Sequence, residues 1–148
     1  MKNKTQSEQE LEDRTIERLE AQGYEYLGKN PDLFKNLKTQ IEKLNHLSFS
    51  DIEFKEQVLD KLFERGSTLF KKALRLREPI QIQDKITKKI RNIKLIDKNN
   101  PSKNIFQVAS QVVLGDTTVK GESHRYDITI LINGFPLVQV ELKKRGVI

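Results

Sequence analysis

Three residues near the carboxyl end of the chain have the types and spacing that divalent-metal chemistry requires. Asp127 is followed, after 13 intervening residues, by Glu141, and Lys143 lies two residues further on. Phosphodiester hydrolysis needs a hard cation that polarises a phosphoryl oxygen and lowers the pKa of a coordinated water. Magnesium prefers one or two carboxylates, with other oxygen ligands completing its shell. Asp127 and Glu141 are therefore candidate metal ligands, and the backbone carbonyl of Leu142 is a candidate third oxygen.

Lys143 and Gln139 lie two residues on either side of Glu141, so in a strand all three share one face. Lys143 is positioned to orient the attacking water or to offset negative charge on the phosphorane, and Gln139 is a candidate for contact with the ligands. The expected reaction is in-line attack by a metal-bound water that leaves a 3′ hydroxyl. The alternative interpretation is an ordinary amphipathic hairpin whose polar face is solvated.

The elements that must position these residues are two strands joined by a tight turn. Two alternating apolar runs, 125–132 and 135–143, flank the pair Asn133-Gly134. Asn-Gly between alternating runs is the strongest short-range signal for a β-hairpin. The sequence therefore predicts a carboxyl-terminal hairpin that carries the candidate site.

The register of this hairpin sets a condition on the site. A two-residue loop pairs Ile132 with Phe135 and, in a regular ladder, places Asp127 and Glu141 on opposite faces. A shared face requires a loop of odd length or a β-bulge, which opposes two residues to one. Pro136 lacks an N–H and makes an irregularity at that point reasonable.

The segment R-Y-D-I-T-I-L-I-N-G-F-P-L-V-Q-V-E-L-K-K-R-G closely resembles the nuclease segment of the restriction (R) subunit of type I restriction-modification enzymes, members of the PD-(D/E)xK nuclease superfamily. The resemblance extends to I-R-N-I-K-L-I-D-K-N-N and to S-E-Q-E-L-E-D-R near the amino end. Tyr126 stands where the superfamily's name places proline. The family continues with a helix carrying a Gln/Tyr motif and with ATP-driven translocase domains, so the resemblance implies a single nuclease domain, 1–148, truncated at its carboxyl end.

The resemblance implies an α+β fold with a mixed sheet flanked by helices. It also implies cleavage of double-stranded DNA with Mg²⁺, for which Mn²⁺ would substitute, in a cytoplasmic complex with modification and specificity subunits. ATP and S-adenosylmethionine would serve only the full complex, which also chooses the DNA sequence. The runner-up interpretation is a non-catalytic nucleic-acid-binding or assembly module on a nuclease-like scaffold.

A helix is predicted from Ser7 to Gln22, because Ser7 and Glu10 form a capping box and Gly23 follows. The resemblance implies that an acid of this helix completes the metal site. Glu8 is the first choice and Glu12 the second. Acids are also common in first helical turns, where they interact favourably with the helix dipole.

Two further helices are predicted, at 32–45 and 50–64, the second opened by the capping box of Ser50 and Glu53. Strands are expected at 90–96 and 104–114, while 67–83 has no clear periodicity. Four basic residues are candidates for contact with DNA phosphates: Lys71, Arg75, Lys144 and Arg145. Lys71 and Arg75 share a face if their segment is helical.

Composition adds weaker constraints. The net charge of +6 favours a polyanionic partner, and the absence of cysteine excludes disulfides and thiolate metal sites. The first residues lack the apolar run of a signal peptide, and no segment approaches membrane-spanning length. These features agree with a cytoplasmic protein that acts on nucleic acid and not at a membrane.

Overall fold

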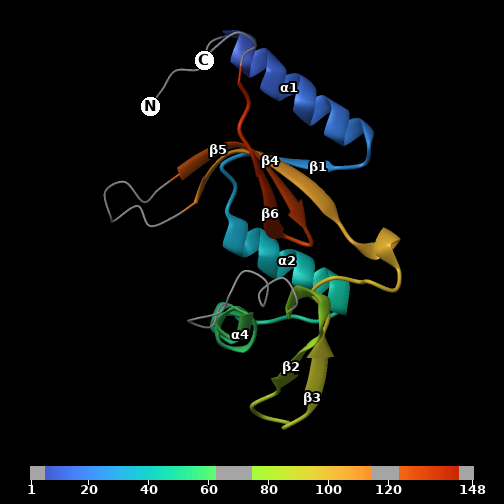
Figure 1. The fold of residues 1–148 in the computed structure, drawn as a ribbon. Coiled ribbons are helices and arrows are strands. Elements are labelled where there is room, and N and C mark those ends of the chain that lie inside the picture. Colours follow the sequence, from blue (N-terminus) through green and yellow to red (C-terminus); the bar gives the residue numbers. More distant parts are fainter. Residues whose placement is uncertain (1–5, 63–74, 115–123, 144–148) are drawn as a thin grey trace. The chain divides into compact units, whose positions relative to one another are not determined.

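The structure is a computed structural model that describes residues 6–62, 75–114 and 124–143. Its contacts divide the chain into two compact units (Figure 1). Unit 1 comprises Met1–Leu33 and Phe106–Ile148, and unit 2 comprises Phe34–Ile105. Unit 2 is thus an insertion, in sequence, between two segments of unit 1. The expectation of a single nuclease domain stays a prediction.

The described residues of unit 1 form one four-stranded sheet and one helix. The helix is α1 (Gln6–Ala21), and the strands are β1 (Glu25–Lys29), β4 (Phe106–Leu114), β5 (His124–Ile132) and β6 (Phe135–Val140). The strand order is β1-β4-β5-β6, with β1 parallel to β4 and the other pairs antiparallel. The expected α+β class and mixed sheet are therefore confirmed.

Helix α1 packs on one face of this sheet. Ile16 forms a buried cluster with Val108 of β4 and Ile128 of β5. Burial of a side chain of this size stabilises the fold by about 1.5–3 kcal/mol. The helix ends where the sequence predicts, because Gly23 adopts φ +98°, a left-handed conformation that glycine enters without steric cost.

The other face of the sheet carries a second buried cluster, formed by Ala109, Val112 and Leu131. Ala109 and Val112 are three residues apart, although alternation along a regular strand would put them on opposite faces. Between them Gln111 has φ +53°, which breaks the alternation of β4. This irregularity lies beside the candidate site on β5.

Unit 2 combines a helical part with a separate two-stranded sheet. Its helices are α2 (Leu33–Asn45), α3 (Asp51–Phe54), the π-helical turn η1 (Lys55–Leu59), α4 (Asp60–Leu62) and the 3₁₀ turn η2 (Pro101–Lys103). Strands β2 (Ile80–Gln83) and β3 (Ile90–Ile93) pair antiparallel. The ring of Phe54 is fully buried and contacts the rings of Phe34 and Phe49.

The predicted capping residue of the helix at 50–64 is confirmed. The Glu53 N–H donates to Ser50 Oγ at 3.2 Å. The π-helical turn within this helix was not predicted. No helix in the described part of the chain is long and apolar enough to cross a membrane.

Candidate active site

The hairpin that carries the candidate site has the predicted two-residue turn. Asn133 and Gly134 have φ values of +50° and +86°. Positive φ at both central residues defines the type I′ turn, which matches the twist of the strands it joins. Ile132 pairs with Phe135, and Leu131 pairs with Pro136.

A β-bulge then changes the register. Ile130 pairs with Val138, so Leu137 is the extra residue opposed to the same stretch of β5. Beyond the bulge, Thr129 pairs with Gln139 and Ile128 with Val140. One further step in this register would pair Asp127 with Glu141 on a shared face, although β6 itself ends at Val140 and Glu141 is the first residue after it. The irregularity that the sequence required in the hairpin is therefore present, as a bulge at Pro136 and Leu137, and the shared face of Asp127 and Glu141 stays a prediction.

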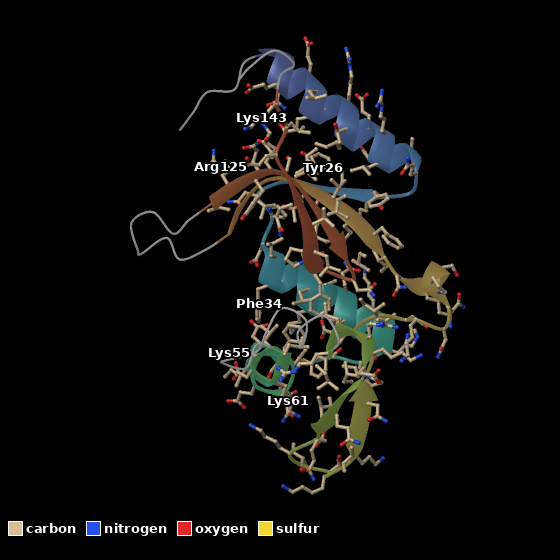
Figure 2. The ribbon with its side chains drawn as sticks, viewed as in Figure 1. Tyr26, Phe34, Lys55, Lys61, Arg125 and Lys143 are labelled. Atoms are coloured by element: carbon tan, nitrogen blue, oxygen red, sulfur yellow. The ribbon has the colours of Figure 1, made fainter. Side chains whose placement is uncertain are left out.

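A hydrogen bond ties Asp127 to the segment that carries Glu141 and Lys143. The Leu142 N–H donates to Asp127 Oδ2 at 2.8 Å. Asp127 is half-buried, whereas Glu141 and Lys143 are exposed. Figure 2 shows Lys143 just beyond the end of β6. The carboxylate of Asp127 thus bonds to the backbone of Leu142, which lies between the other two candidate residues. The side chains of Glu141 and Lys143 are accessible to a ligand from solvent.

The pair next to Asp127 on the same face consists of Thr129 and Gln139. Thr129 is fully buried, and its hydroxyl has no hydrogen-bond partner within the described part of the chain. Gln139 is exposed, and its Nε2 donates to the Pro136 carbonyl at 3.4 Å. Gln139 therefore lies where the sequence puts it, and its predicted contact with the metal ligands stays a prediction.

Glu12, the second choice among the first-helix acids, has a hydrogen bond to this part of the sheet. Glu12 is fully buried, and Gln111 Nε2 donates to its Oε1 at 2.8 Å. Gln111 lies between the pairs Ser110–Ile128 and Val112–Tyr126, at the level of Asp127. Glu8, the first choice from sequence, is half-buried one turn earlier on α1.

The donor set fits a hard cation with few protein ligands. Within residues 6–62, 75–114 and 124–143, no three acids or histidines converge closely enough to form a complete metal cage. Magnesium does not require one, since it usually keeps several waters and takes one or two carboxylates plus substrate phosphate. Asp127 and Glu141, with the Leu142 carbonyl, match that requirement.

The basic residues proposed for DNA contact have mixed outcomes. Lys71, Lys144 and Arg145 lie outside the described residues. Arg75 Nη1 donates to the carbonyls of Lys61 and Leu62, both at 3.4 Å, so its guanidinium satisfies carbonyls at the end of α4. Contact between Arg75 and phosphate stays a prediction.

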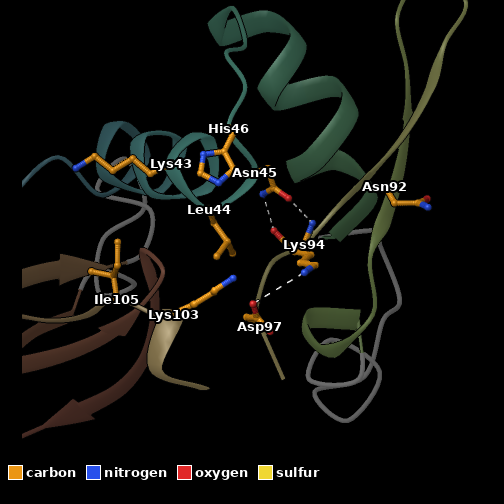
Figure 3. A pocket seen from close by; sticks show the side chains of 9 residues that line it. All are labelled: Lys43, Leu44, Asn45, His46, Asn92, Lys94, Asp97, Lys103 and Ile105. Carbon is orange, nitrogen blue, oxygen red and sulfur yellow. Dashed lines mark hydrogen bonds and ion pairs between the residues drawn. The ribbon is translucent and has the colours of Figure 1, made fainter. Parts of the chain in front are cut away.

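A cavity of about 570 Å³ lies within unit 2, next to the end of α2 (Figure 3). Asn45 holds the Lys94 backbone there, accepting from its N–H at 2.7 Å and donating to its carbonyl at 2.8 Å. Lys94 Nζ also lies 3.9 Å from Asp97 Oδ2. None of the candidate nuclease residues lines this cavity.

The chain is similar to known proteins along almost its whole length. Residues 5–148 match the family described as "Type I restriction enzyme R protein N terminus". The chain belongs to this family. The resemblance inferred from the hairpin sequence is thereby confirmed, and the match also includes the segments that form unit 2.

Relatives from two genera show the same relationship. The chain is 36% identical over 147 residues to the "Type I restriction enzyme EcoprrI endonuclease subunit" of Escherichia coli. It is 37% identical over 149 residues to the "Type I restriction enzyme SauCOLORF180P endonuclease subunit" of Staphylococcus aureus (strain COL). Each alignment covers 96% of this chain, but only 45% of the E. coli relative and 15% of the S. aureus relative.

Proposed function

We propose that this domain is a metal-dependent endonuclease that hydrolyses phosphodiester bonds of double-stranded DNA. The observation that carries the proposal is the bulged hairpin, whose shifted register ends at the pair Ile128–Val140, next to Asp127 and Glu141. In the same hairpin the Leu142 N–H donates to Asp127 Oδ2 at 2.8 Å. Membership in a family of restriction-enzyme R proteins supports this activity. The proposed core is that of the PD-(D/E)xK nucleases.

In this proposal Asp127 and Glu141 hold Mg²⁺ or Mn²⁺, with the Leu142 carbonyl as a further oxygen ligand. The ion, when bound, supplies a polarised phosphoryl oxygen and a more acidic water. The Leu142 N–H keeps one oxygen of Asp127 fixed, so the carboxylate is oriented before the ion arrives.

Lys143 acts on the reacting groups and not on the ion. Its side chain is exposed and lies two residues from Glu141, in the segment that follows β6. There it donates a hydrogen bond to the attacking water or to a phosphate oxygen as negative charge develops. Glu12 Oε1 accepts from Gln111, which lies between two residues of β4 that pair with the neighbours of Asp127 on β5, and through this contact we assign Glu12 a positioning role.

The relatives are endonuclease subunits, which supports a role for this chain within a larger assembly. We propose that the chain works within a type I complex that also contains modification and specificity subunits. In that arrangement the choice of DNA sequence, and the use of ATP and S-adenosylmethionine, belong to other domains or subunits.

Nicking of supercoiled plasmid in Mn²⁺ tests the proposal. Wild type should convert supercoiled to open-circular DNA, and Asp127→Ala and Lys143→Ala should both lose this activity. The two variants separate the roles, because Lys143→Ala should still bind Mn²⁺ while Asp127→Ala should not. Nicking retained by both variants would overturn the assignment and favour a non-catalytic module.

A further inference from the structure

The hairpin of β2 and β3 in unit 2 combines exposed apolar side chains with positive charge. Ile86, at its tip, is 92% exposed, and Ile90, at the start of β3, is 64% exposed. Lys85, Lys88 and Lys89 surround Ile86 in the sequence. Figure 1 shows the hairpin extending beyond the helices of unit 2. An apolar tip held among lysines is not explained by packing within unit 2.

The charge of the chain is concentrated in the unit that carries this hairpin. Unit 2 has 17 lysines and arginines against 9 aspartates and glutamates, a net charge of +8. Unit 1, which carries the candidate nuclease site, has 10 against 12, a net charge of −2. The positive field that attracts a polyanion therefore originates in unit 2.

The two faces of the ribbon, residues 80–93, differ in chemistry. Directly opposed residues share a face, so Ile82 lies with Arg91 and Gln81 lies with Asn92. The first face is fully buried at Ile93, half-buried at Ile82 and exposed at Arg91. The second is exposed and carries three side-chain amides beside one apolar residue, namely Gln81, Gln83, Asn92 and Ile90. Side-chain amides offer both donors and acceptors, as the edges of base pairs do.

The tip is held in one conformation by Asp84. Asp84 Oδ1 accepts from the N–H groups of Ile86 and Thr87, both at 2.8 Å. The Lys88 N–H donates to the Asp84 carbonyl at 2.9 Å, and Lys88 itself has φ +59°. A loop that is ordered before binding loses less conformational entropy when it meets a partner.

The charge at the tip is only partly neutralised within the chain. Lys85 forms an ion pair with Glu56 at 3.1 Å. Lys88 and Lys89 have no ion pair within the part of the chain that the structure describes. These two ammonium groups are therefore available to an anionic partner.

We propose that the β2–β3 ribbon enters the major groove of duplex DNA, with Lys88 and Lys89 on phosphates of the flanking strands. The major groove of B-DNA is about 12 Å wide and admits a two-stranded β-ribbon. Gln81, Gln83 and Asn92 then face the base edges, and Ile86 enters the groove between the phosphate contacts. The choice of duplex DNA as the polyanion rests on the proposed nuclease function, but the contact itself requires neither Asp127 nor a metal ion.

Fluorescence anisotropy with labelled duplex DNA, in EDTA and over a range of salt concentrations, tests the ribbon contact. Lys88→Gln/Lys89→Gln removes both charges and keeps an unbranched polar side chain at each position. Each phosphate contact contributes about 0.9 to the slope of log K against log salt, which corresponds to about eightfold in affinity at 0.1 M salt. The double variant should therefore bind about sixtyfold more weakly, with a slope smaller by about two.

The matched control is Lys29→Gln/Lys55→Gln, which removes two exposed lysines outside the ribbon. Equal losses in the two double variants would overturn the proposal, because they would show a general charge effect. Preferential binding to phosphatidylserine vesicles over duplex DNA would overturn it in favour of a membrane surface. Since EDTA removes every metal-dependent step, failure here leaves the nuclease proposal standing, and loss of nicking leaves this one standing.

A second measurement keeps both lysines in place. The chain has no cysteine, so Ile86→Cys labelled with an environment-sensitive fluorophore reports on the tip alone. Ile52→Cys is the control, since Ile52 is 68% exposed and lies on α3, outside residues 80–93. Duplex DNA should change the emission at position 86 and leave position 52 unaffected. An unchanged signal at position 86 at saturating DNA would contradict the proposal.

Discussion

Replacing Asp127 in two ways separates its structural contribution from its proposed metal binding. Asp127→Asn keeps an oxygen that can accept from the Leu142 N–H, but removes the charge. Asp127→Ala removes the acceptor as well. Because that hydrogen bond is 2.8 Å long and joins β5 to the segment after β6, the two variants should differ in stability even without metal.

The expected magnitudes follow from the nature of the bond. A hydrogen bond to a charged group contributes about 1.5–3 kcal/mol to stability. For a chain of this size, each kcal/mol corresponds to about 2–4 °C in Tm, so Asp127→Ala should melt about 3–12 °C lower. Asp127→Asn should lose about 1 kcal/mol or less, since a neutral hydrogen bond remains. At a Mn²⁺ concentration 100 times its Kd, wild type should gain about 2.7 kcal/mol from binding.

Thermal melts with and without Mn²⁺ measure both effects. Wild type and the control Glu17→Gln, an exposed acid on α1, should be stabilised by the metal, and neither Asp127 variant should be. A full metal-induced shift in Asp127→Asn would refute Asp127 as a ligand. An Asp127→Ala variant as stable as wild type without metal would refute the structural importance of the bond to Leu142.

Three further predictions concern the scaffold. Ile16→Ala should lower the free energy of unfolding by about 2–5 kcal/mol, because the cavity would lie between α1 and the sheet; urea denaturation would show this, and a loss below 1 kcal/mol would contradict the packing. Ser50→Ala should cost about 1 kcal/mol through loss of the helix cap, with Ser50→Gly expected to cost less in the same assay. The Asn100 N–H lowers the pKa of Asp97 below its ordinary value of 3.8. The ionised Asp97 therefore stabilises the folded chain fully above pH 3.8, and this stabilisation is lost as the pH falls through the lower pKa of the folded state. The urea midpoint of wild type should exceed that of Asp97→Asn at pH 6, and this difference should shrink by pH 3; a constant difference would contradict the shift.

The hairpin could be predicted in detail because its signals are local. Asn133-Gly134 specifies the turn. With a two-residue turn, Asp127 and Glu141 can share a face only if the hairpin contains an irregularity, and the structure has a bulge at Leu137. The first helix was predicted within one residue at each end, since Gly23 marks its stop. These features depend on residues close together in sequence.

Features that depend on distant residues could not be predicted in this way. The bond between Gln111 and Glu12 spans 99 residues and needs a left-handed backbone at Gln111, which no local pattern indicates. The choice between Glu8 and Glu12 as a ligand from the first helix stays a prediction. The parallel pairing of β1 with β4 also lacks a local signal, because unit 2 lies between them in the chain.

A divalent ion held by Asp127 and Glu141 is the claim on which the proposed chemistry depends. Isothermal titration of Mn²⁺ into the chain tests it most directly, with Glu141→Gln and Lys143→Ala measured in parallel. We expect wild type and Lys143→Ala to bind the ion with similar affinity, and Glu141→Gln to lose the binding heat. Binding by Glu141→Gln as tight as that of wild type would contradict the proposed site.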